Sequence, residues 1–332
     1  MKNDALKSTL SIAPMIDWSY SHFRRFMRIL APSSLIYTEM QTTGAIEHNP
    51  KRTLYFNSLE QPLALQLGGS DKGQLADCAV KAELQGYCEV NLNLGCPSDK
   101  VQAGRFGACL MSEPKLVADC IKAMKKSVNI TVSAKTRIGI DHQDSYSFFR
   151  YFIEQLIEAG SDKIIVHARK AWLKGLSPKQ NRSIPPINYD YVYRIKQEYP
   201  HIPIVINGNI LNSEDIKAHL NKVDGVMLGR LACQNPFAIA RIHDELTEKQ
   251  KDLRRTDLIR TYFDYIQQEF EQGERLTLLL KPIFNFAHGL ASASQWKKLL
   301  TDMIQQKQLR AKEAIKLLFK LEEEANTTEI SI

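Results

Sequence analysis

Several common signals are missing from this sequence of 332 residues. No apolar run approaches the roughly 18 residues needed to cross a bilayer, so no membrane contact is expected. The polar N-terminus, Met1 to Leu10, has no apolar signal core, which argues against secretion. The six cysteines show no C-x-x-C spacing, so neither a paired zinc site nor thioredoxin-like chemistry is indicated, and no metal is expected. We therefore expect a cytoplasmic protein whose cysteines are mostly reduced and buried.

Positive charge is concentrated near the C-terminal end. The whole chain carries a formal net charge of +7. From Lys281 to Lys320, eight Lys or Arg residues stand against only Asp302 and Glu313, a net charge of +6. Two interpretations remain open at this point. The stretch is either a solvated helical face or a docking surface for a polyanion.

Eight short apolar runs alternate with helical segments over the first 230 residues. Some runs are apolar on both faces, as in Ile164-Ile165-Val166, which suits a parallel sheet buried on both sides. Eight such units predict an α/β protein with a (β/α)₈ barrel over residues 1–244. A doubly wound open sheet is the alternative, disfavoured because no early G-x-G-x-x-G turn is present. The predicted strands are Ser11–Met15, Ile36–Met40, Pro62–Leu67, Cys88–Leu94, Ile130–Thr136, Lys163–His167, Ile202–Asn207 and Gly225–Gly229.

No strand-like run follows about Asp244, and apolar residues recur instead at spacings near three and four. This predicts a small helical bundle over residues 255–324, after a charged linker from Glu245 to Arg255. The tail from Ala325 to Ile332 is expected to be frayed. The predicted helices are Arg255–Glu271, Leu276–His288, Ser294–Gln306 and Leu309–Glu324.

The most informative stretch is VNLNLGCPS, residues 90–98. A strand runs into a tight Gly-Cys-Pro turn, which places Cys96 at the C-terminal end of that strand with Asn93 three residues upstream. Barrel enzymes carry out their chemistry at this end. A cysteine on an apolar strand is more often an inert core residue. Because no histidine adjoins Cys96 in sequence, the functional interpretation is a neutral thiol that donates a proton rather than a nucleophile.

The other strand ends carry polar residues and glycines. The Gly-rich turns after the seventh and eighth predicted strands are typical of a phosphate cradle, since glycines allow backbone N–H groups to approach an anion. Each residue alone has an ordinary structural reading, such as a core histidine or a lysine that extends to solvent. Together they predict one ligand site at the mouth of the barrel. The residues are Pro14, Met15, Ile16, Gln66, Asn93, Lys135, Arg137, His167, Arg169, Asn207, Gly208, Asn209, Gly229 and Arg230.

Taken together, these segments resemble the tRNA-dihydrouridine synthases across the whole predicted barrel. The segment VHARKAWLKGLSPKQNRSIPP, residues 166–186, is similar to the A-type branch, which acts at positions 20 and 20a of the tRNA D-loop. The resemblance implies bound FMN and NADPH as the reductant, with tRNA as the partner and no obligate protein partner. The residues that it assigns to FMN are Pro14, Met15, Ile16, Gln66, Lys135, His167, Asn207, Gly208, Asn209, Gly229 and Arg230.

The same resemblance assigns Cys96 as proton donor, and Asn93 and Arg137 as contacts to the target uridine. It implies reduction of the uracil 5,6 double bond, with hydride from reduced FMN and a proton from Cys96 to carbon 5. Lys135 and Arg137 are expected to stabilise the developing negative charge.

Residues outside this core are assigned to tRNA. Asn181 and Arg182 match tRNA-contacting positions of the A-type branch. Lys297 stands just after Trp296, where that branch has arginine, so it keeps the charge but loses the planar guanidinium. Ser294 replaces a second arginine.

Two other functional classes are consistent with parts of the sequence. A flavin barrel enzyme that reduces a small molecule would act on free uracil and would not need the basic helical segment. A non-catalytic RNA-binding protein on a degenerate barrel would lack flavin absorbance. The intact set of strand-end residues argues against the second class.

Overall fold

The computed structural model describes residues 9–248 and 252–329. Its contacts divide the chain into two compact units. The first unit comprises residues Met1–Ser19 and Ser33–Gly229, and the second comprises Tyr20–Pro32 and Arg230–Ile332.

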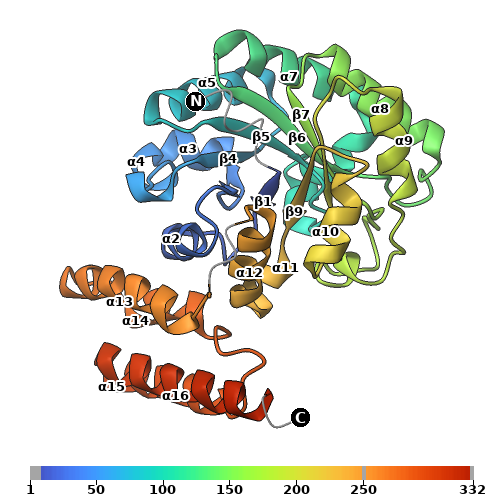
Figure 1. Ribbon diagram of the computed structural model, residues 1–332. Coiled ribbons are helices and arrows are strands. Elements are labelled where there is room, and N and C mark those ends of the chain that lie inside the picture. Colours follow the sequence, from blue (N-terminus) through green and yellow to red (C-terminus); the bar gives the residue numbers. More distant parts are fainter. Residues whose placement is uncertain (1–8, 249–251, 330–332) are drawn as a thin grey trace. The chain divides into compact units, whose positions relative to one another are not determined.

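The first unit is a closed parallel barrel of eight strands (Figure 1). Each strand pairs with its neighbours in chain order, and the pairing of β2 with β4 and of β1 with β9 closes the ring. A further two-residue strand, β3, lies beside the end of β4. The strands are β1 (Leu10–Ile12), β2 (Leu35–Tyr37), β3 (Gln41–Thr42), β4 (Leu63–Gly68), β5 (Glu89–Leu94), β6 (Thr131–Arg137), β7 (Lys163–His167), β8 (Ile204–Asn207) and β9 (Gly225–Leu228).

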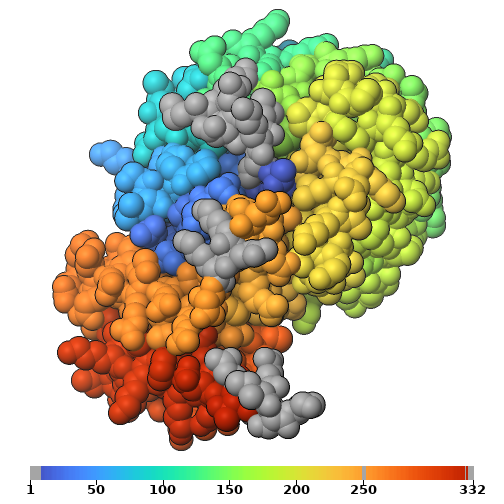
Figure 2. Space-filling view, viewed as in Figure 1, coloured from blue at the N-terminus to red at the C-terminus, as the bar shows by residue number. Residues whose placement is uncertain are grey.

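Helices between the strands cover the outside of the barrel, and α8 to α10 form a continuous yellow-green surface in Figure 2. Local signals set their ends: α5 begins where Asp71 accepts a hydrogen bond from the N–H of Gln74, and it ends at Gly86 with φ of 101°. The helices of this unit are α3 (Thr43–His48), α4 (Pro50–Thr53), α5 (Lys72–Gln85), α6 (Asp99–Ala103), α7 (Pro114–Ser127), α8 (Tyr146–Glu158), α9 (Asp190–Glu198) and α10 (Ser213–Leu220), with short 3₁₀ turns η1 (Ser58–Glu60), η2 (Gly107–Ser112) and η3 (Gln180–Arg182).

The barrel interior has an apolar side and a polar side. Since side chains alternate along a strand, every second residue faces inward. Inward residues such as Ile165, Val205 and Met227 form an apolar cluster. On β5 the inward positions are instead polar, Glu89 and Asn91 among them, although β5 is buried along its whole length. Polar groups buried this deeply need partners, and these residues supply them to one another.

The second unit is helical. Helix α2 carries Phe26, whose ring lies 4.7 Å from that of Tyr262 and 5.2 Å from that of Phe286. Trp296 is fully buried, and its Nε1 donates to the carbonyl of Ile283 at 2.8 Å. The helices are α2 (Ser21–Leu30), α11 (Arg230–Gln234), α12 (Pro236–Leu246), α13 (Arg255–Glu271), α14 (Leu276–Leu280), α15 (Ala293–Gln306) and α16 (Ala311–Glu329), with the 3₁₀ turn η4 (Lys281–Ile283).

The predicted fold class, a (β/α)₈ barrel followed by a helical bundle, is confirmed. The bounds of the compact units differ from the predicted 1–244 and 255–324, because α2, α11 and α12 group with the C-terminal helices. Aromatic contacts between α2 and distant residues explain the difference, since no local pattern reports them.

Three local predictions need correction. The predicted helix 276–288 stops being α-helical after Leu280, because Pro282 has no N–H to donate. The tail does not fray at Ala325, since α16 continues to Glu329, and residues 330–332 lie outside the described part. The linker begins only after α12 ends at Leu246, and residues 249–251 within it are likewise not described.

Two findings bear on composition. All six cysteines are free, and four of them are buried, as expected; Cys96 and Cys109 are half-buried. Among the described residues, no helix is both long enough and apolar enough to span a bilayer.

Candidate active site at the mouth of the barrel

Cys96 lies two residues after β5, on a turn that hydrogen bonds hold in place. Asn93 Oδ1 accepts the N–H groups of Gly95 at 3.2 Å and of Cys96 at 3.0 Å. The carbonyl of Cys96 accepts the N–H of Ala108 at 2.9 Å. The half-buried thiol itself donates to Ser98 Oγ at 3.6 Å. The backbone is therefore fixed while the sulfur stays accessible at the end of the barrel where chemistry is expected.

Gly107 completes this turn. Its φ of +79° is one that residues with a side chain rarely adopt. A Cβ at this position would stand 2.5 Å from the carbonyl oxygen of Cys96 and 2.4 Å from Val101 Cγ1. Glycine is required here because η2 packs directly onto the backbone that carries the thiol.

Two cations end strand β6 next to this turn. Lys135 Nζ donates to Asn207 Oδ1 on β8 at 3.2 Å. Arg137 is 3% exposed and donates from Nε to the carbonyl of Gly95 at 2.8 Å and from Nη1 to those of Lys170 and Asn181, both at 3.0 Å. Within the described ranges neither cation forms a salt bridge with a carboxylate. This positive charge, buried at Arg137 and half-buried at Lys135, is therefore left for a ligand to neutralise.

The electrostatics support this reading. Burial, followed by the charge of Arg137, lowers the pKa of Lys135 to about 7. Burial likewise lowers the pKa of Arg137, and Arg182 and Arg169 contribute in the same direction. A negative charge on Cys96 would raise the pKa of both Lys135 and Arg137. An anion bound here would have the same effect, and perturbed groups of this kind are typical of functional sites.

Glycine turns bring the neighbouring strand ends close together. Gly208 follows β8 with φ of +125°, and a Cβ there would lie 2.8 Å from Cδ2 of His167 at the end of β7. The carbonyl of Gly208 accepts the hydroxyl of Tyr189 at 2.7 Å. Gly229 follows β9, and the nearest atom to its added Cβ would be Ala13 Cβ at 3.7 Å. The missing side chains let these strand ends pack closely, and the phosphate site expected at the two turns stays a prediction.

The segment after β1 adds an apolar wall. Pro14 and Met15 are half-buried, and Met15 packs against the apolar cluster inside the barrel. The N–H of Met15 donates to Ser19 Oγ at 3.0 Å, whose hydroxyl donates to the carbonyl of Ala13 at 3.1 Å. Ile16, the next residue, is 56% exposed.

Comparison with known proteins identifies the family. The model for dihydrouridine synthase (Dus) matches residues 11–324. The chain belongs to the dihydrouridine synthase family. It is 50% identical over 298 residues to the tRNA-dihydrouridine(20/20a) synthase of Shewanella oneidensis, covering 90% of this chain and 89% of that protein. It is 49% identical over 294 residues to the protein of that name in Escherichia coli K12, covering 88% and 85%, and 47% identical over 295 residues to that of Vibrio cholerae, covering 88% and 90%.

In this Dus family member, the side chains of Gln66 and Asn93 are buried near the ends of β4 and β5 and contact each other. Gln66 is 1% exposed and Asn93 is 9% exposed. Asn93 Nδ2 donates to Gln66 Oε1 at 2.8 Å. The structure thus brings together two residues that the resemblance assigns to different ligands.

The loop after β7 holds two of the residues expected to contact tRNA. Asn181 is completely buried, and its amide is occupied within the loop: Oδ1 accepts the N–H of Trp172 at 2.8 Å and Nδ2 donates to the carbonyl of Trp172 at 2.9 Å. Asn181 therefore orders the loop, and its assigned contact to tRNA stays a prediction. The next residue, Arg182, is exposed, as a tRNA-contacting residue must be.

Arg230 and Lys297 belong to the helical unit. Arg230 directly follows Gly229 in the chain and opens α11, and both it and Lys297 on α15 are exposed. Their assigned roles stay predictions.

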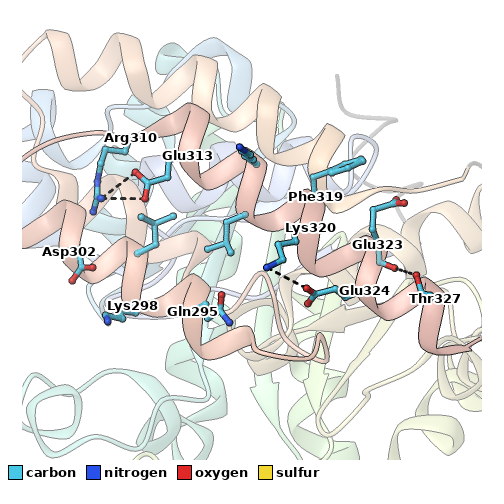
Figure 3. A pocket seen from close by; sticks show the side chains of 13 residues that line it. Gln295, Lys298, Asp302, Arg310, Glu313, Phe319, Lys320, Glu323, Glu324 and Thr327 are labelled. Carbon is cyan, nitrogen blue, oxygen red and sulfur yellow. Dashed lines mark hydrogen bonds and ion pairs between the residues drawn. The ribbon is translucent and has the colours of Figure 1, made fainter.

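Helices α15 and α16 border an open groove of about 1180 Å³ (Figure 3). It is lined by side chains of both signs: Arg310 pairs with Glu313 at 3.2 Å, and Lys320 pairs with Glu324 at 3.6 Å. Acidic residues beyond Lys320 therefore offset part of the basic stretch seen in the sequence. A mixed surface of this kind favours the solvated-face interpretation for the groove itself.

One residue that links two loops of the site was not predicted from the sequence. Gln102 donates from Nε2 to the carbonyls of Pro97 at 2.8 Å and Leu173 at 2.7 Å, which joins the Cys96 turn to the loop after β7. The two carbonyls lie on loops far apart in sequence, so no local pattern reports the contact.

Proposed function

We propose that this protein reduces uridine to 5,6-dihydrouridine at positions 20 and 20a of the tRNA D-loop, in the cytoplasm, with bound FMN and NADPH as the reductant. The observation that carries the proposal is a half-buried cysteine, Cys96, beside two cations, Lys135 and Arg137, that have no carboxylate partner in the described part of the chain. The names of the relatives support the tRNA substrate and the positions.

The residues present fit a flavin mononucleotide. Phosphate and an anionic ring both need positive charge and closely approaching backbone, which Lys135 and the turns at Gly208 and Gly229 offer. Bound FMN would supply the hydride, and NADPH the electrons that regenerate it. The barrel residues that would hold it are Pro14, Met15, Ile16, Gln66, Lys135, His167, Asn207, Gly208, Asn209 and Gly229.

Cys96 is the group that supplies the proton. Its thiol would protonate carbon 5 of the uracil ring, leaving a thiolate on the protein. Lys135 and Arg137 lie close enough for this thiolate to raise the pKa of each, so both cations stabilise it. No other side chain needs to change its charge during the step.

Arg137 and Asn93 are the two buried residues assigned to the target uridine. The guanidinium of Arg137 donates three hydrogen bonds to backbone carbonyls, one of them that of Gly95, and so stabilises the turn. It would therefore act on the substrate mainly through its charge. The Asn93 amide donates one N–H to Gln66, which leaves its second N–H for a uracil carbonyl.

The loop after β7 provides a docking surface for the phosphate backbone. It holds five cations and no acidic residue between His167 and Tyr189. Lys174, Lys179 and Arg182 are exposed. A D-loop nucleotide must leave its stack to reach Cys96, at a cost of a few kcal/mol that such contacts offset.

The direct test is to map dihydrouridine in tRNA from cells that lack this protein. Loss of the modification at positions 20 and 20a, restored by the intact gene, is the expected result. Purified protein with FMN and NADPH should then modify unmodified tRNA. Loss at other positions, or reduction of free uracil as readily as of tRNA, would contradict the proposal and favour a different substrate.

We also expect tRNA affinity to fall steeply with salt. Replacing Lys174, Lys179 and Arg182 together by alanine should lower the slope of log K against log[salt] by about 2 to 3, because each lost phosphate contact lowers it by about 1. The matched control removes three exposed lysines of α7, Lys115, Lys122 and Lys126. Equal slopes for both triple variants, measured by filter binding, would rule out the loop as the docking surface.

A further inference from the structure

A line of hydrogen bonds runs inward from the Cys96 turn through the interior of the barrel. The N–H of Cys96 donates to Asn93 Oδ1 at 3.0 Å, and Asn93 Nδ2 donates to Gln66 Oε1 at 2.8 Å. Gln66 Nε2 then donates to Asn91 Oδ1 at 2.8 Å. Each amide accepts from the side nearer the mouth and donates toward the interior.

The line ends at a buried carboxylate. Asn91 Nδ2 donates to Ser133 Oγ at 2.7 Å, and the hydroxyl of Ser133 donates to Glu89 Oε1 at 2.5 Å. Glu89 is 0% exposed and also accepts the hydroxyl of Tyr37 at 2.6 Å and Nζ of Lys163 at 2.5 Å. The interior network is defined here as the side chains of Asn93, Gln66, Asn91, Ser133 and Glu89.

The carboxylate gives the network a single polarity. An ionised carboxylate only accepts hydrogen bonds, so the hydroxyl of Ser133 must donate to Glu89 and can only accept from Asn91. Asn91 must therefore donate to Ser133 and accept from Gln66, and Gln66 in turn must accept from Asn93. If the amide of Asn93 turned over, its NH₂ group would face the N–H of Cys96, and two donors would meet. Little water reaches these groups to relieve the mismatch, since all five are at most 9% exposed.

We propose that Glu89 is a positioning residue: through the interior network it fixes the orientation of the Asn93 amide and thereby the turn that presents Cys96. Lys163, 74 residues further along the chain, pairs with Glu89 at 2.5 Å and gives the buried carboxylate a cationic partner. The consequence for turnover rests on the proposed function; the positioning itself does not.

Two variants of similar size separate positioning from general stability. Ser133→Ala removes the hydroxyl that links Asn91 to Glu89 and keeps the Glu89–Lys163 ion pair. Tyr37→Phe removes a different hydroxyl from the same carboxylate but leaves every bond of the network in place. Burial and the Glu89 carboxylate raise the pKa of Tyr37, so in the native protein it is a neutral donor as Ser133 is. Glu89→Gln tests the anchor, and Ser133→Ala carries the test if that variant does not fold.

The readout is hydrogen exchange of the Gly95 and Cys96 amides in the full-length protein, followed by mass spectrometry on overlapping peptides. We expect Ser133→Ala to speed this exchange by about threefold to tenfold, the equivalent of one weakened hydrogen bond, with Tyr37→Phe close to the native rate. The rate at which iodoacetamide alkylates Cys96 should change in Ser133→Ala and stay at the native value in Tyr37→Phe.

Turnover gives a second readout. Ser133→Ala should lower kcat for tRNA by about tenfold or more with KM unchanged, because a displaced thiol slows the proton transfer but not the docking. Native exchange in Ser133→Ala, or equal acceleration in both variants, would overturn the proposal. If native protein has no activity on tRNA, the proposed function fails, while the exchange rates still decide the role of Glu89.

Discussion

Replacing Cys96 by alanine is expected to lower dihydrouridine formation by about 100-fold to 10,000-fold, the range that a positioned proton donor contributes. The turn should survive the change, because its bonds to Asn93 and Ala108 are made by the backbone and not by the thiol. Flavin content, read from visible absorbance of the purified protein, should therefore stay at the native level.

The matched control is Cys109→Ala. Cys109 is the other half-buried cysteine, and its thiol donates to the carbonyl of Phe106 at 3.2 Å. Because nothing places it beside Lys135 or Arg137, its removal should leave turnover within about twofold of native, as for most substitutions away from a functional group. Full activity of the Cys96 variant on unmodified tRNA would remove Cys96 from its assigned role.

The barrel was predictable because several of its strands are continuous apolar runs in the sequence. Ile164-Ile165-Val166 is buried on both faces, and such runs alternate with helices eight times. Strand β3 was not predictable, since two residues give no pattern. Helix α13 is local and well patterned, and its observed bounds, Arg255–Glu271, are those predicted.

Long-range packing set the limits of the prediction. Helix α2 groups with helices more than 200 residues away through Phe26 and Tyr262. The Glu89–Lys163 pair is another case: a charged residue at the start of each of two strands, β5 and β7, looks unfavourable until the curved sheet brings the two side chains together at 2.5 Å across the intervening strand β6. Sequence patterns record local periodicity, whereas these contacts exist only once the sheet has closed.

The site was predicted at the level of strand ends, and the roles of individual residues were less accessible. Cys96, Lys135 and His167 lie where the strand ends place them. Asn181 is buried and Arg137 is committed to backbone carbonyls. Burial of polar side chains inside loops follows from three-dimensional packing, so a match to a tRNA-contacting position could not distinguish direct contact from loop support.

Lys135→Met should weaken FMN binding to the apoprotein by about 10-fold to 100-fold at pH 7, the effect of losing a charged hydrogen-bond donor. The lysine is held by Asn207 alone among the described residues, so the variant removes charge without breaking a salt bridge. Fluorescence quenching of FMN by the apoprotein measures the affinity directly.

The pH dependence gives the sharper result. With a pKa of about 7 in the ligand-free site, Lys135 loses its proton as the pH rises above 7. Above that pH, Lys135 must take up a proton from solvent when the anion binds, and this uptake costs binding free energy. FMN affinity should therefore fall from pH 7 to pH 9, by up to about tenfold per pH unit, while the FMN phosphate keeps its charge. Lys135→Arg keeps a positive charge throughout and should give a flat profile. A decline that persists unchanged in Lys135→Met would assign the titration to another group and remove Lys135 from the flavin site.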